Sequence, residues 1–235
     1  QKELSPTDKF VQGDRIKIFI GEVEEATKFT KTFVSRKSEE LLRGLLELEV
    51  PEIYEGIIEI KNIAREAGSR SKVAVYSNDK NLDVKGACIG RNGMRIQTII
   101  DELQGEKIDV VLWNEDVREF VKNALNPAQV LSVEIVEEGE DNLKVAKVVV
   151  AENQLSLAIG KKGQNSRLAA RLCGVKIDIH TGSDKMAGSE EDEFKEKSAF
   201  QDSLDETENT EKTSDSQNDI EVEESAFAGL SEDNE

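Results

Sequence analysis

Two glycine tetrads of the form Gly-x-x-Gly lie 70 residues apart in this chain, at positions 90–93 and 160–163. An isoleucine precedes each tetrad, and basic side chains lie inside it: Arg91 in the first, and Lys161 and Lys162 in the second. Apolar residues recur at helical spacing on both sides of the second tetrad. Each tetrad therefore predicts a tight turn between two short amphipathic helices, and the repeat predicts two copies of one folding unit.

The similarity between the two copies extends beyond the tetrads. The strand-like run GEKIDVV at 105–111 corresponds to GVKIDIH at 174–180, and two strand patterns precede each tetrad. Ser38 is a predicted N-cap of a leucine-rich helix that Pro51 ends, and Asn114 is the predicted cap of the helix that opens the second copy. The predicted order of elements in each copy is therefore helix, strand, strand, helix, helix, strand.

The N-terminal segment has a different pattern. Its apolar residues are spaced mostly by two, which predicts a strand, and they are Val11, Ile16, Ile18, Ile20 and Val23. A second strand candidate, KTFVSRKS, follows a polar turn at 27–30. Two strands alone do not make a stable sheet, so this segment is predicted to be part of a larger β structure.

The net charge of −18 is concentrated at the C-terminus. Residues 184–235 hold 19 acidic and 4 basic side chains, which leaves the rest of the chain nearly neutral. Hydrophobic periodicity also stops after Gly182, so we expect a disordered acidic tail, whose small apolar group around Phe227 is a candidate partner-binding peptide. An alternative is that the tail competes with a polyanion for the basic loops.

The unit of helix, GxxG turn, helix and strand resembles the KH domain, whose GxxG loop clamps the backbone of single-stranded nucleic acid. Two strands before the helices and one after them is the bacterial type II arrangement. The runs AREAGSRSKVAV, GACIG, NALNPAQVLSV and QLSLAIGKKGQNSRLAARL make residues 1–182 similar to the NusA family of bacterial transcription elongation and termination factors. GDRIKIFI and FVSRKS resemble the S1-type OB fold that precedes the KH pair in that family.

The expected fold class is therefore α+β. A C-terminal portion of an S1-type OB-fold domain at 1–37 precedes a first KH domain at 38–113 and a second at 114–182, with the disordered acidic tail at 183–235. We expect the beginning of the barrel, and the domain by which this family docks on RNA polymerase, to lie outside this sequence.

The resemblance implies an RNA-binding transcription factor that contacts nascent single-stranded RNA and modulates pausing, termination and antitermination by RNA polymerase. The loop amides and loop cations would hold phosphates, an apolar groove would take the bases, and polar residues after each loop would extend the contact. The candidate RNA-binding residues are Ile89, Gly90, Arg91, Asn92, Gly93, Arg95, Ile159, Gly160, Lys161, Lys162, Gly163, Gln164, Asn165, Arg167 and Arg171.

An RNA-processing enzyme appendage, such as the KH and S1 part of polynucleotide phosphorylase, is the alternative. There a single KH domain precedes the S1 domain, whereas here the order is reversed and the KH domain is doubled. A ribosome-associated assembly factor is a weaker candidate, because it would usually bring a GTPase P-loop, which this sequence lacks.

We expect no enzymatic activity, no cofactor and no metal. His180 is the only histidine and no catalytic motif is present, while Cys88 and Cys173 lie in apolar helical surroundings as small core residues. Tyr76 and Trp113 are expected to pack in the core. Without an apolar run of membrane-spanning length or a signal peptide, the chain is predicted to be cytoplasmic, and we expect a monomer.

Overall fold

A computed structural model describes residues 3–25, 30–138 and 143–182 of the chain. These residues belong to one compact unit. The acidic tail predicted at 183–235 lies outside the described residues, as do most of the turn at 27–30 and part of the turn at 137–142.

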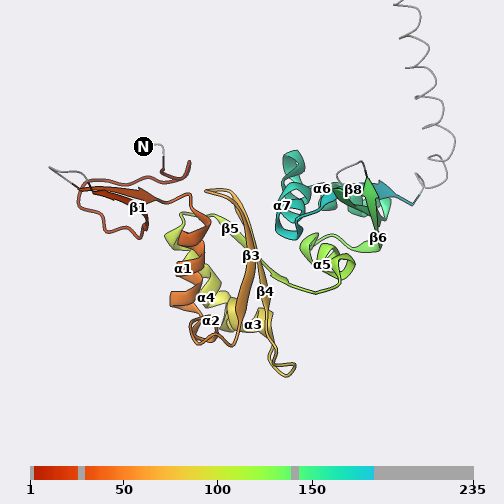
Figure 1. Cartoon of the computed structure of the whole chain (residues 1–235), viewed down its shortest axis with the longest axis horizontal. Coiled ribbons are helices and arrows are strands. Elements are labelled where there is room, and N and C mark those ends of the chain that lie inside the picture. Colours follow the sequence, from red (N-terminus) through yellow and green to blue (C-terminus); the bar gives the residue numbers. More distant parts are fainter. Residues whose placement is uncertain (1–2, 26–29, 139–142, 183–235) are drawn as a thin grey trace, which may run out of the picture. The chain divides into compact units, whose positions relative to one another are not determined.

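The first repeat has the predicted order of elements. Its elements are α1 (Glu39–Glu49), α2 (Pro51–Tyr54), β3 (Glu59–Glu66), β4 (Arg70–Tyr76), α3 (Val84–Ile89), the 3-10 turn η1 (Arg91–Gly93), α4 (Met94–Glu102) and β5 (Lys107–Leu112) (Figure 1). The short helix α2 was not predicted. Its first residue is Pro51, whose fixed φ and missing amide suit the first position of a helix as well as they end the preceding one.

The second repeat follows the same order without a counterpart of α2. Its elements are α5 (Val117–Ala124), β6 (Val130–Glu138), β7 (Leu143–Val150), α6 (Glu152–Ile159), the 3-10 turn η2 (Lys161–Gly163), α7 (Gln164–Cys173) and β8 (Lys176–Thr181). The predicted duplication of helix, strand, strand, helix, helix, strand is confirmed.

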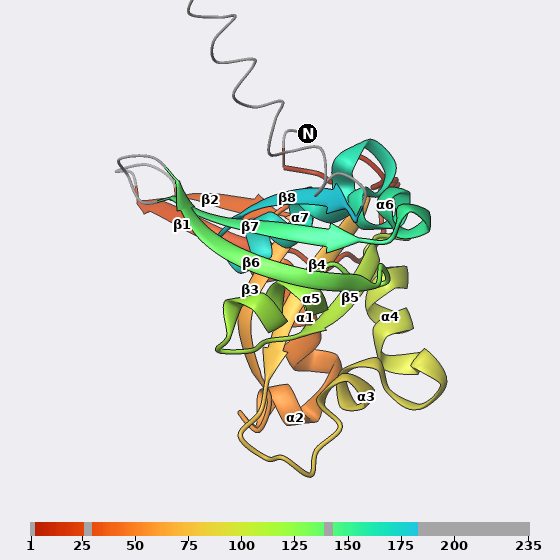
Figure 2. The same ribbon diagram turned by 90° about the vertical axis from the view of Figure 1, so that its right-hand side faces the viewer.

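Each repeat contains one three-stranded sheet of the same topology (Figure 2). The order is β3-β4-β5 in the first and β6-β7-β8 in the second, with an antiparallel first pair and a parallel second pair in both. The two strands before the loop helices and the one after them confirm the type II arrangement.

Helix α1 packs its leucines into the core of the first repeat. Leu42, Leu45 and Leu46 are almost inaccessible and belong to one buried cluster with strand residues such as Val73 and Val75. Ser38 caps this helix as predicted, since its side chain accepts a hydrogen bond from the amide of Glu40. The amphipathic pattern of the sequence therefore specifies this core directly.

The core of the second repeat extends onto the first. Ala64, Ala74 and Val111, on the strands of the first sheet, belong to the same buried cluster as Leu168 and Leu172 of α7. The side-chain amide of Asn62 also donates to the carbonyl of Leu172 at 2.7 Å. The sheet of the first repeat thus has helices of its own on one face and the second repeat on the other.

A buried lysine joins the two repeats at the same interface. Lys72 has no accessible surface, and its ammonium group lies 3.0 Å from Asp109 and donates to the carbonyl of Asn126. Burial lowers the pKa of Lys72, although Asp109 opposes this effect.

The prediction that Asn114 caps α5 is wrong. Asp116 is the cap, since its side chain accepts a hydrogen bond from the amide of Arg118. Asn114 lies two residues too early and accepts a hydrogen bond from the amide of Asp116 instead.

The N-terminal segment forms a two-stranded antiparallel sheet, β1 (Phe19–Glu25) with β2 (Thr30–Ser35). The prediction of a strand that starts near Val11 is therefore wrong for the residues before Phe19. Side chains hold this stretch instead of strand pairing, and one example is the guanidinium of Arg36, which donates to the carbonyl of Lys17. Arg36 is buried, pairs with Asp8 and Glu102, and so ties this segment to α4.

No helix among the described residues is long and apolar enough to cross a bilayer.

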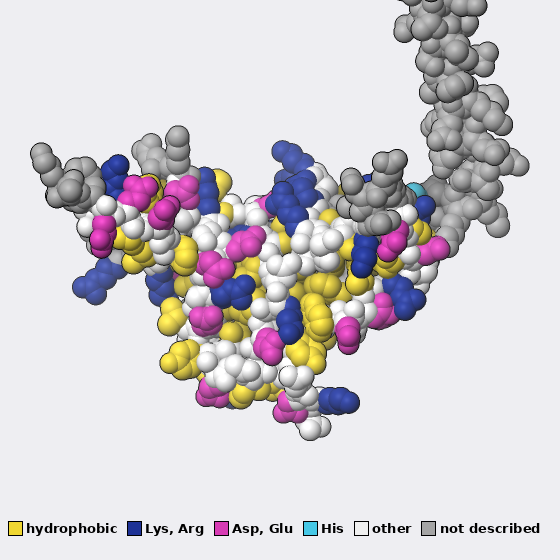
Figure 3. All heavy atoms as spheres, viewed as in Figure 1, with side chains coloured by type: hydrophobic (Ala, Val, Ile, Leu, Met, Phe, Trp, Pro, Cys, Tyr) yellow, Lys and Arg dark blue, Asp and Glu magenta, His cyan; other side chains and the backbone are white. Residues whose placement is uncertain are grey.

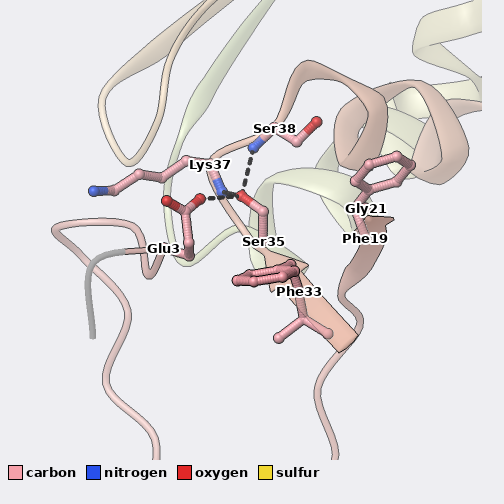
Figure 4. Close-up of a pocket in the computed structure, with 8 residues that line it drawn as sticks. Glu3, Phe19, Gly21, Phe33, Ser35, Lys37 and Ser38 are labelled. Carbon is pink, nitrogen blue, oxygen red and sulfur yellow. Dashed lines mark hydrogen bonds between the residues drawn. The ribbon is translucent and has the colours of Figure 1, made fainter. Parts of the chain in front are cut away.

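A shallow pocket lies on this small sheet (Figure 4). Phe19 and Phe33 line it, and the hydroxyl of Ser35 donates to Glu3 and accepts the amides of Lys37 and Ser38. Phe33 is half exposed, as a two-stranded sheet cannot cover its own apolar side chains.

Candidate nucleic-acid interface

The two GxxG loops have almost the same backbone conformation. In each loop the first glycine, the third residue and the last glycine all have positive φ. The φ values are 78°, 55° and 76° at Gly90, Asn92 and Gly93, and 76°, 54° and 70° at Gly160, Lys162 and Gly163. The predicted turns are therefore confirmed, and the φ angles of the two loops match at each of these three positions.

The first glycine of each loop is required for close packing as well as for its φ. A Cβ atom at Gly160 would lie 2.8 Å from the Cβ and 2.9 Å from the backbone nitrogen of Asn165. At Gly90 the same atom would meet the side chain of Arg95. The loop therefore folds back tightly onto the helix that follows it.

Both loop helices begin without a side-chain cap. Gly93 and Gly163 are the N-cap residues of α4 and α7, and neither has a side chain to accept the first helical amides. The amides of Met94 and Gln164, the first helical residues, bond instead to the carbonyls of Arg91 and Lys161, while the helix dipole still favours negative charge at this end. This is the backbone arrangement by which proteins bind phosphate groups.

The loop cations are exposed. Arg91, Lys161 and Lys162 lie on the surface, and no carboxylate among the described residues pairs with them. Ile89 and Ile159, which precede the loops, are 36% and 38% exposed, so an apolar side chain is available beside each basic loop. Figure 3 shows Lys and Arg side chains gathered over α7 on the face in view.

The residues that follow the loops differ from the prediction. Arg95 is held inside the first repeat, where its guanidinium donates to Glu52 at 2.9 Å and to the carbonyl of Ala87 at 2.7 Å. Asn165, at the corresponding position of the second repeat, is only 4% exposed. Its amide donates to the carbonyls of three residues on or next to α5 and α6, which are Leu125, Leu157 and Ala158.

A side chain that is buried and bonded in this way is not accessible at the surface of the structure. The predicted RNA contact of Asn165 is therefore corrected to a role in holding the preceding helix against the loop. The geometry at Gly160 gives the reason, because the missing Cβ lets Asn165 approach the loop closely. Arg95 holds the first loop in a similar way, through a longer side chain that also reaches Glu52.

Gln164 and Arg167 contact the first repeat. Both donate to the carboxylate of Glu66, each at 2.7 Å, and Arg171 contributes to the positive field around that group. The hydrogen bond from Arg167 is the main cause of a lowered pKa at Glu66. Arg171 itself is exposed, and its contact with RNA stays a prediction. Glu66 was not among the predicted site residues, because nothing in the sequence near it indicates a partner about a hundred positions away.

Two aromatic residues, Tyr76 and Trp113, form a small group with Lys61. Tyr76 and Trp113 meet edge to face with their ring centroids 5.3 Å apart, and the ammonium of Lys61 lies 5.1 Å from the first ring and 5.3 Å from the second. Both aromatic side chains are partly exposed, so the prediction of core packing holds only in part.

The described residues contain no cluster of three metal-binding side chains. Burial raises the pKa of Cys88 to about 11 and that of Cys173 to about 12, so both thiols stay protonated at neutral pH. His180 is exposed near the end of β8.

Together, the duplicated fold and the paired loops define a tandem type II KH module. Residues 36–113 match the family model of the NusA-like first KH domain, and residues 117–187 match that of the NusA-like second KH domain. The chain belongs to the NusA family.

Curated relatives from several bacteria show the same relationship. Over 182 residues the chain is 50% identical to the transcription termination/antitermination protein NusA of Halalkalibacterium halodurans and 52% identical to that of Bacillus subtilis. The Thermus thermophilus protein of the same name is 51% identical over 180 residues. These matches cover 77% of this chain but 47%, 48% and 45% of the three relatives, so the chain spans about half of their length.

Proposed function

We propose that this chain binds nascent single-stranded RNA through both KH domains and takes part in RNA polymerase pausing, termination and antitermination. The observation that carries the proposal is the pair of matching loops, each with exposed cations, a flanking isoleucine and a following helix that begins without a side-chain cap. KH domains use such loops to clamp a nucleic-acid backbone. The name shared by the relatives supports the role in transcription.

In this proposal the chain binds RNA and catalyses no reaction. Its two thiols are protonated at neutral pH, and the RNA contacts come from the backbone amides of the loops, from Arg91, Lys161 and Lys162, and from Ile89 and Ile159. The relatives carry the name of a transcription protein, so the appendage of a processing enzyme is not retained. Bacterial transcription takes place in the cytoplasm, which is the compartment we propose, with RNA polymerase as a partner and a monomer as the working form.

We also propose that residues 1–37 are part of an S1-type OB fold next to the KH pair. The paired strands β1 and β2 support this, as does the half-exposed Phe33, which a complete barrel would cover. We propose domain boundaries at 38–113 and 114–182, and the family matches at 36–113 and 117–187 support them.

The test reverses the charge of the second loop. A variant with Lys161→Asp and Lys162→Asp should bind a mixed-sequence single-stranded RNA more weakly, and the dependence of affinity on salt should become shallower. Each RNA phosphate that the protein no longer neutralises removes about 0.7 from the slope of log affinity against log salt for a single strand. Arg91→Asp should act in the same direction at the first loop.

A matched control carries the same change of charge elsewhere on the second domain. Lys144 and Lys176 lie near the starts of the neighbouring strands β7 and β8. Lys176 comes after the C-terminal end of α7, whereas the second loop lies before the N-terminal end of that helix. Their double replacement by Asp should change affinity less and leave the slope nearer to that of the wild type. A loop variant with the wild-type slope would show that the loop is not a phosphate clamp.

A further inference from the structure

The loop of the second KH domain is held by a residue of the first. The guanidinium of Arg167 donates through Nε to Glu66 Oε1 at 2.7 Å and through Nη1 to the carbonyl of Lys162 at 3.2 Å. Arg167 therefore connects Glu66, at the end of β3, to the loop residue that has the unusual positive φ. A non-glycine residue in that conformation needs surrounding contacts to keep it there.

The other oxygen of Glu66 is also engaged by the second domain. Gln164, the first residue of α7, donates to Glu66 Oε2 at 2.7 Å, and its side-chain nitrogen lies 2.7 Å from the hydroxyl of Ser69 in the turn after β3. Both carboxylate oxygens thus bind residues that follow the loop within four positions. The side chain of Glu66 is 23% exposed, so these bonds are only partly in competition with water.

The first loop has no such contact across the domains among the described residues. Met94 and Gln97 stand at the positions that correspond to Gln164 and Arg167, and the side-chain amide of Gln97 donates to Asp101 in its own helix. Arg95 bonds to Glu52 and to the carbonyl of Ala87, which belong to the same domain. The two loops have the same backbone but different supports: the first is held within its own domain, and the second is held from the neighbouring domain.

We propose that Glu66 is a positioning residue for the second loop, so that the first KH domain sets the RNA affinity of the second. This inference rests on the proposed RNA-binding function. In it, Glu66 fixes Gln164 and Arg167, Arg167 fixes the carbonyl of Lys162, and the loop amides and lysines are thereby preorganised for phosphate. Preorganisation raises affinity because less conformational freedom is lost on binding.

The sign of the effect separates this role from simple electrostatics. Glu66 carries a negative charge next to a cationic loop and pairs with Arg167. If charge alone mattered, its removal would free Arg167 and tighten RNA binding. If Glu66 positions the loop, the same removal weakens binding.

The experiment compares Glu66→Ala, Glu66→Gln and a matched control, Glu134→Ala, which removes an exposed carboxylate from β6 of the second domain. We expect Glu66→Ala to bind single-stranded RNA about threefold to tenfold more weakly, as befits the loss of partly exposed charged hydrogen bonds. Glu66→Gln retains an acceptor oxygen for Gln164 and should lie between Glu66→Ala and the wild type. Glu134→Ala should bind as tightly as the wild type or slightly more tightly.

A second measurement needs no RNA. Backbone NMR relaxation of the RNA-free Glu66→Ala variant should show greater mobility at Lys161 and Lys162 and no change at Arg91 and Asn92. Equal or tighter RNA binding by Glu66→Ala, or unchanged mobility of the second loop, would overturn the inference. If the wild-type chain did not bind RNA at all, the proposed function would fail instead, and the relaxation measurement would still decide whether Glu66 holds the loop.

Discussion

The two glycines of the second loop should differ strongly in their tolerance of alanine. Gly160 has φ 76° and ψ 172°, a conformation essentially confined to glycine, and its replacement costs about 1–3 kcal/mol in backbone strain. An added Cβ would also lie 2.9 Å from the backbone nitrogen of Asn165, which cannot rotate away. Shifting the backbone to relieve such an overlap costs about 1–3 kcal/mol more.

Gly163 provides a matched comparison three residues later. Its φ of 70° and ψ of 18° are left-handed, which costs alanine about 1 kcal/mol, and a Cβ there would meet no atom closer than 3.9 Å. Gly160→Ala should therefore lower the free energy of unfolding by about 2–6 kcal/mol and Gly163→Ala by about 1 kcal/mol. Gly90→Ala should fall between them, because the three atoms nearest to its Cβ belong to the side chain of Arg95, of which Cγ and Cδ can rotate away and Cβ cannot.

Urea denaturation followed by circular dichroism measures these differences directly, since the midpoint shifts while the slope stays constant if only stability has changed. Equal losses for Gly160→Ala and Gly163→Ala would refute the reasoning, because they would show that the close approach of Asn165 contributes nothing. A greater loss for Gly90→Ala than for Gly160→Ala would refute the distinction between a flexible and a rigid neighbour.

Three further predictions concern the rest of the chain. Removing residues 184–235, which carry 19 acidic and 4 basic side chains, should tighten RNA binding modestly at low salt, and the gain in affinity should shrink as salt rises. Equal affinities of the full-length and shortened chains at low salt would exclude competition by the tail. Because burial lowers the pKa of Lys72 below 10.5, the unfolded chain binds more protons than the folded chain at pH values just below 10.5. The free energy of unfolding should therefore gain a contribution that rises as pH approaches 10.5 from below and that Lys72→Met lacks. The shared core around Ala74 and Leu172 predicts equal rotational correlation times for the two KH domains by NMR relaxation, and different values would show independent domains.

Local features of the fold could be predicted from the sequence because they depend on residues close together in the chain. The loop glycines, the Ser38 cap and the leucine face of α1 each follow from spacing within one or two helical turns. The errors were also local: Asn114 and Asp116 are both good cap residues two positions apart, and the alternation from Val11 resembles a strand that has no partner before Phe19.

The site could be predicted only as far as its loops. Arg91, Lys161 and Lys162 are exposed as expected, since a charged side chain in a glycine turn has no place in a core. The residues after the loops could not be assigned, because a polar residue at a helix start can face solvent, its own domain or the neighbouring one. Arg95, Asn165 and Arg167 are engaged in contacts that only the packing of helices and domains decides.

Each domain contacts the other through a different surface. Equivalent strand positions in the two sheets show that the two domains are not interchangeable. Lys72 pairs in register with Asp109 in the first sheet, and Lys147 with Asp178 in the second, yet Lys72 is fully buried and Lys147 is exposed. Beside Lys72 lies the small Ala74, which lets α7 approach the first sheet closely. Without the second domain, the first would expose this apolar face to water; without Glu66 of the first, the second would lose the support of its loop. The first domain therefore buries an apolar face against its neighbour, and the second domain receives a contact at its loop from its neighbour, so exchanging the two domains would remove both contacts.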